Sequence, residues 1–150
     1  MTRITTEIMK QGALVLSIVA SVAGCQQEEG TPIGPRGGII SSADGHFSVE
    51  IPGGALTEEV AITIEEVDCE PNQAIDACFE VGPVGLPLLR PATVTYQVDE
   101  QMLEDFAPEA LTVLVEGEEA WAELADRSVD SRAVTASAVY LSSFALIAAD

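Results

Sequence analysis

Regular alternation of apolar and polar residues restricts the fold of this chain more than any other feature. Within Phe47–Ile51 every second residue is apolar, and the residues between are Ser48 and Glu50. A period of two is typical of a β-strand that is buried on one face only. The same kind of pattern recurs at 60–65, 94–98, 111–115, 121–124, 134–140 and 144–148.

Turn-forming residues separate these segments. They include Asp44-Gly45, Pro52-Gly53-Gly54, Gly82-Pro83 and Glu116-Gly117, which are combinations that favour chain reversal. One short helix is predicted at 100–106, where three apolar side chains share a face. About eight to ten short strands with a single short helix predict an all-β fold, an antiparallel β-sandwich, over residues 34–148.

The first 24 residues have the layout of a signal peptide. A short polar head carries Arg3 and Lys10, and an apolar run follows at 12–20. That run is too short to span a hydrocarbon core of about 30 Å. Residues 22–25 then read Val-Ala-Gly-Cys and resemble the lipobox of bacterial lipoproteins, where an apolar residue and two small ones precede the cysteine that takes the lipid.

The lipobox predicts how the mature protein is attached. We expect cleavage before Cys25, transfer to its thiol of a diacylglyceryl group whose acyl chains are fatty acids such as palmitate, and a lipidated tether at 25–33. Because a single acyl chain binds a bilayer only marginally, the two or three chains of a lipoprotein anchor are needed for stable attachment. We expect the protein in the bacterial cell envelope; Gln26 in place of aspartate after the cysteine favours the outer membrane.

The charge of the chain restricts its partners. From Cys25 onward there are four Arg and no Lys against 24 Asp and Glu. Such an excess repels nucleic acid and anionic membrane surfaces, so we expect no nucleic-acid partner. It keeps the domain soluble and could attract cations or basic proteins.

Two cysteines remain for the domain itself. Cys69 and Cys78 form an even pair, which an oxidising compartment favours as a disulfide. The Pro71-Asn72 turn and Asp76 lie between them, so the pair is predicted to close a short loop. Metal binding by two cysteines without a nearby histidine is a poor alternative.

Several segments match, in order, the pattern of one known family. They are Gly34–Ile40 (GPRGGII), Phe47–Leu56 (FSVEIPGGAL), Val81–Leu86 (VGPVGL) with Arg90–Tyr96 (RPATVTY), Trp121, and Val139–Leu146 (VYLSSFAL). Together they resemble the ZU-five domain, the β-sandwich of zonula occludens proteins, netrin receptors and ankyrins, which bacterial lipoproteins also carry. The resemblance implies a protein-interaction or scaffold module with no enzymatic activity and no cofactor. The implied partner is an unidentified envelope or extracellular protein.

The resemblance also raises self-cleavage as an alternative. Some members of the family cut themselves at a His-Phe-Ser site near the last strands, where the serine hydroxyl attacks the preceding carbonyl. The matching positions are Tyr140, Leu141 and Ser142. The activating histidine is absent there, which puts this activity in doubt. A literal His-Phe-Ser at 46–48 lies in the early strand and is interpreted as coincidence.

Other chemistry has little support. His46 is the only histidine, and its neighbours Ser41, Ser42 and Asp44 are too close along one turn to form a Ser-His-Asp triad. Calcium-dependent surface binding stays open as an alternative because carboxylates are abundant, although no D-x-D-x-D-G run is present. We therefore predict no catalytic and no metal-binding residues, and we expect Trp121 in the core.

Overall fold

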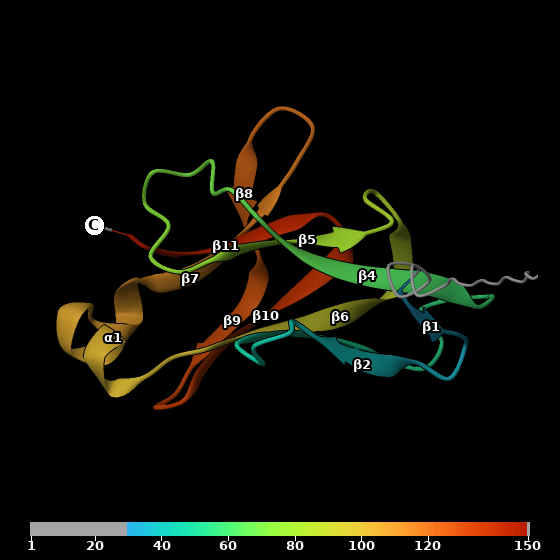
Figure 1. Cartoon of the computed structure of the whole chain (residues 1–150), viewed down its shortest axis with the longest axis horizontal. Helices are drawn as coiled ribbons and strands as arrows, with labels where there is room; N and C mark the ends of the chain where they lie inside the picture. Colours follow the sequence, from blue (N-terminus) through green and yellow to red (C-terminus); the bar gives the residue numbers. More distant parts are fainter. Residues whose placement is uncertain (1–29, 150) are drawn as a thin grey trace, which may run out of the picture.

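The chain forms two antiparallel β-sheets, which confirms the all-β fold class (Figure 1). The computed structural model describes residues 30–149, so the predicted signal peptide and Cys25 lie outside the described residues. The six-stranded sheet has the order β1 (Thr31–Ile33), β4 (Val60–Val67), β5 (Cys78–Gly82), β11 (Ser143–Ala148), β7 (Leu111–Glu116) and β8 (Trp121–Glu123). The five-stranded sheet has the order β2 (Gly38–Ser41), β3 (Phe47–Ile51), β6 (Pro87–Gln97), β10 (Ala133–Tyr140) and β9 (Ala125–Val129).

Strand β3 illustrates how alternating apolar and polar residues form a strand with one buried face. Its three apolar side chains are at most 1% exposed, whereas Glu50 faces solvent. The strand pairs with β2 on one side and with β6 on the other. Because its period of two matches the pleat, one face enters the core and the prediction for this segment is confirmed.

A helical connection leads from β6 to β7. It consists of α1 (Glu100–Asp105) and a 3-10 turn at Pro108–Ala110. The carboxylate of Asp99 accepts a hydrogen bond from the backbone N–H of Met102 and so caps α1. The helix predicted at 100–106 is confirmed.

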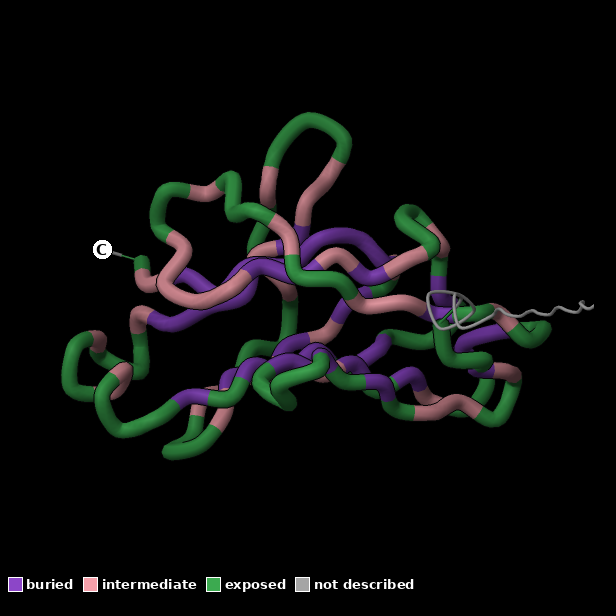
Figure 2. Tube along the Cα trace, viewed as in Figure 1, coloured by how far each residue is buried: buried purple, intermediate pink, exposed green. Residues whose placement is uncertain are grey.

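Aromatic side chains from both sheets meet in one core. The ring of Phe47 on β3 stacks on Phe79 of β5 with centroids 4.8 Å apart. It also contacts Tyr96 of β6 at 4.9 Å and Phe144 of β11 at 5.9 Å. Figure 2 shows that the buried stretches follow the strands, while the turns and hairpin tips are exposed.

The hydroxyl of Tyr96 ties the five-stranded sheet to the six-stranded one. It donates to the backbone carbonyls of Phe144 at 3.0 Å and of Ala77 at 3.1 Å. Burial raises the pKa of this phenol, and the nearby carboxylate of Asp76 adds to the shift. The side chain therefore stays neutral and keeps its proton for these bonds.

Four strands were not predicted from the pattern: β1, β2, β5 and β9. Thr31–Ile33 lies within the predicted tether at 25–33 but belongs to the domain, because it pairs with β4 as β1 and buries the side chain of Ile33. Within residues 30–149, no helix is long and apolar enough to cross a membrane.

Candidate functional site

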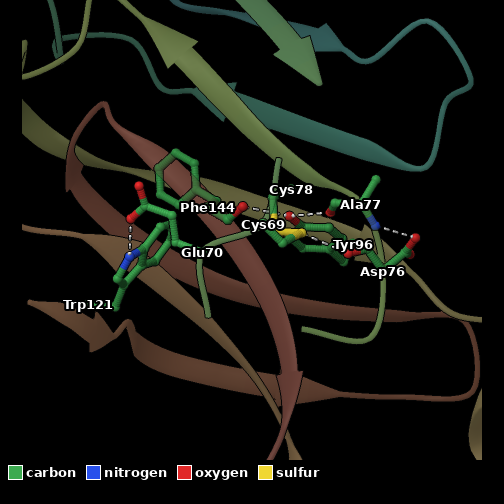
Figure 3. Close-up of a disulfide and its surroundings, with 8 residues drawn as sticks. All are labelled: Cys69, Glu70, Asp76, Ala77, Cys78, Tyr96, Trp121 and Phe144. Atoms are coloured by element: carbon green, nitrogen blue, oxygen red, sulfur yellow. Dashed lines mark hydrogen bonds between the residues drawn. A yellow bond between two sulfur atoms is a disulfide. The ribbon is translucent and has the colours of Figure 1, made fainter. Parts of the chain in front are cut away.

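The predicted disulfide between Cys69 and Cys78 is present (Figure 3). It closes the loop that joins β4 to β5, with the two Cα atoms 5.3 Å apart. Further hydrogen bonds hold this loop: Ala77 accepts from the Tyr96 hydroxyl, and Glu70 accepts from the indole N–H of Trp121 at 3.2 Å. The disulfide thus fixes the loop against the six-stranded sheet.

The expectation that Trp121 fills the core is wrong. Its side chain is only partly buried, on the edge strand β8, and its indole nitrogen bonds to the exposed Glu70. A tryptophan at a sheet edge can donate a hydrogen bond from its indole N–H to a surface acceptor while its ring packs over neighbouring residues.

The surroundings of His46 do not form a catalytic triad. Its side chain is 52% exposed, and its Nδ1 lies 3.8 Å from the Oδ2 of Asp76. The nearby Ser42 hydroxyl instead donates to Asp44 at 2.6 Å and accepts from the backbone N–H of Phe47. The hydrogen bond from Ser42, followed by that from the His46 backbone, lowers the pKa of the Asp44 carboxyl. This arrangement stabilises the turn between β2 and β3.

Ser142, the candidate nucleophile for self-cleavage, lies in the short connection between β10 and β11. It is 4% exposed, and its hydroxyl donates to the backbone carbonyl of Glu116 at 2.9 Å. Since His46 is the only histidine of the chain and lies beside Asp76, the contacts of Ser142 include no histidine that could act as its base.

The calcium alternative requires several oxygen ligands close together. In the described part of the chain, no three side chains of His, Cys, Asp or Glu lie close enough together to hold a metal ion. The carboxylates are instead spread along strands and turns.

One hollow lies where the two sheets present free strand edges, and we call it the edge groove. It has a volume of about 640 Å³. Its lining comes from β1, β2 and β4, namely Gly30, Thr31, Ile39, Ile40, Ser41, Ile62, Thr63, Ile64 and Glu65. Figure 1 shows β2 and β4 in the two different layers, with β1 near their right-hand ends.

Both walls of the edge groove carry backbone groups available for pairing. On one wall, β1 covers β4 only at Val60–Ile62, and no other described strand pairs with that edge of β4 over Ile64–Val67. On the opposite wall, β2 is the last described strand of its sheet. The side chain of Ile39 on β2 is 63% exposed. A free edge is a template for a further strand.

Carboxylates continue from the edge groove across the outer face of the six-stranded sheet. We call Glu65, Glu80 and Glu116 the acidic row. Glu65 stands directly opposite Glu80, and Glu116 stands opposite Trp121. A smaller hollow of about 260 Å³ lies beside the disulfide loop, lined by Val67, Asp68, Glu70, Glu80, Glu116, Trp121 and Ser143.

Sequence reasoning named the disulfide but missed the edge groove and the acidic row. The pairs that form them join residues distant in sequence, so no local pattern reports them. The only local signal is the pair of adjacent glutamates at 65–66, which is unremarkable in a chain this acidic.

Comparison of the chain with models of known protein families and with curated proteins gives no match.

Proposed function

We propose that this chain is a lipid-anchored protein of the bacterial cell envelope whose domain is a non-catalytic protein-interaction module. Its signal peptide and lipobox at Cys25 support the anchor. The ordered motifs of 34–146 support a ZU-five-like β-sandwich, and the aromatic contacts between Phe47 and residues of the other sheet agree with two sheets packed face to face.

The observation that carries the proposed interaction is the pair of free strand edges in the edge groove. An extended segment of another protein can add to such an edge, because main-chain hydrogen bonds supply affinity and alternate side chains supply specificity. The exposed Ile39 would give that segment an apolar contact beside the strand edge. The proposed module therefore binds its partner at the edge groove.

The anchor predicts the mass of the mature protein. Extracted in detergent and measured without reduction, the protein is expected to have the mass of residues 25–150 plus acyl chains, less the two hydrogens lost in the disulfide. The Cys25→Ser variant should lose the acyl mass. An unacylated chain in the wild type would contradict the anchor, and two fragments split before Ser142 would show self-cleavage instead.

The edge groove predicts where a partner can be captured. A photoreactive phenylalanine analogue in place of Ile39 is expected to give a cross-linked adduct in the intact envelope. Val139 is the matched control because it is similarly exposed, at 57%, but lies on β10, outside the lining of the edge groove. Equal adduct yields at the two positions, or none at position 39, would argue against binding at this edge.

A further inference from the structure

The acidic row begins with a pair of like charges that the free domain leaves uncompensated. Glu65 on β4 stands directly opposite Glu80 on β5, and like charges in this position destabilise a sheet. None of the hydrogen bonds or ion pairs found among the described residues joins either carboxylate to a cationic side chain. The pair therefore weakens the free domain unless another molecule supplies a positive charge.

The free edge of β4 determines where a compensating positive charge would lie. Ile62 is buried in the core, so Ile64 and Glu66 lie on the same inner side, and Glu65 lies on the outer face. A strand added along Ile64–Val67 would set one side chain directly opposite Glu65 on that outer face. This side chain would then face Glu65 across the new pair, with Glu80 one strand further away.

We propose that the partner of the edge groove is an extended segment with an arginine or lysine in register with Glu65 and an apolar residue in register with Ile64. This inference rests on the proposed function, since it names the partner chemistry of the same groove. The added strand would extend the six-stranded sheet beyond β4, and its cation would offset one of the two negative charges of the like-charged pair.

Charge complementarity selects this occupant over the chain's own segments. The residues that precede Gly30 end in Glu28-Glu29, which would add negative charge beside Glu65. A second copy that paired β4 with β4 in antiparallel fashion would bring the acidic pair at 65–66 of the two copies together. A basic segment from another protein meets neither repulsion.

A pair of peptides tests the proposal on the full-length protein, labelled with nitrogen-15 and held in a zwitterionic detergent. The probe is Ser-Thr-Thr-Arg-Val-Thr-Ser, and its control has Glu in place of Arg. We expect the Arg peptide to shift the amide signals of Ile64–Val67 and to bind about tenfold more tightly than the Glu peptide. The Glu65→Gln variant should lose most of this preference, whereas Glu118→Gln, a carboxylate of the β7–β8 turn outside the row, should keep it.

The possible results distinguish addition of a strand to β4 from selection of a positive charge opposite Glu65. Shifts at Ile64–Val67 with equal affinity for both peptides would leave strand addition in place and overturn the charge selection. Shifts confined to Glu80, Glu116 and Trp121 would show ionic binding without strand addition and also overturn the inference. The absence of shifts with either peptide would count against this inference and against the edge groove as a binding site, whereas the cross-linking at position 39 tests the groove independently.

Discussion

Replacing Phe47 with alanine is expected to lower the free energy of unfolding by about 3–5 kcal/mol, the usual cost of truncating a buried phenylalanine. The ring is 0% exposed and contacts aromatic residues of both sheets. Its loss would remove the contacts of this ring with Phe79, Tyr96 and Phe144 and leave a cavity at the centre of the core. Because native stability is commonly only 5–15 kcal/mol, the variant should be close to unfolding at physiological temperature.

Urea denaturation followed by circular dichroism measures this change. Ile39→Ala on the neighbouring strand is the control, because its side chain is 63% exposed and surface truncations usually change stability by less than about 0.5 kcal/mol. Equal decreases in the free energy of unfolding for the two variants would mean that the buried ring of Phe47 contributes no more to stability than an exposed side chain does.

Removing the disulfide has the second-largest expected effect. The Cys69→Ser, Cys78→Ser double variant should be less stable by about 2–3 kcal/mol, the chain-entropy value for a closed loop of about ten residues. Replacing both cysteines together avoids a free thiol. The fluorescence of Trp121 should also change, since its hydrogen-bond acceptor Glu70 belongs to the loop.

The same denaturation experiment, followed by circular dichroism and by tryptophan fluorescence, distinguishes a loss of stability of the whole domain from a change confined to the disulfide loop. The wild type under reducing conditions serves as the matched control, because it keeps both sulfur atoms and loses only the bond. Unchanged stability of the double variant and of the reduced protein would show that the loop is held by other contacts, such as the bond from Tyr96 to Ala77.

The strands that could be predicted from the sequence are those whose period of two reflects burial on one face. β3 and α1 agree with prediction because the alternation in one and the shared apolar face in the other are local signals. The pairing of Cys69 with Cys78 could also be predicted, since only two cysteines remained once Cys25 was assigned to the predicted anchor. These features depend on residues close together in the chain.

The features that could not be predicted depend on distant pairing. β9 has almost no buried side chain, so it carries no alternation; it is an edge strand whose Arg127 donates to the backbone carbonyls of Glu109 and Leu111. Trp121 was misplaced because its partner Glu70 is 51 residues away. The edge groove arises only because β1 stops covering β4 at Ile62.

The position of β1 also decides how the domain would respond to mechanical load. Were the chain held at the proposed Cys25 anchor, tension would reach the domain through β1, which is a three-residue strand at the sheet edge. Only three residue pairs join it to β4, so these pairs are expected to break before those of the core strands. The last strand, β11, lies between β5 and β7 in the interior of the same sheet, so a pull on the opposite end would have to shear several pairs at once. Tension from the membrane would therefore peel β1 away and lengthen the tether, exposing more of the β4 edge while the aromatic core stays intact.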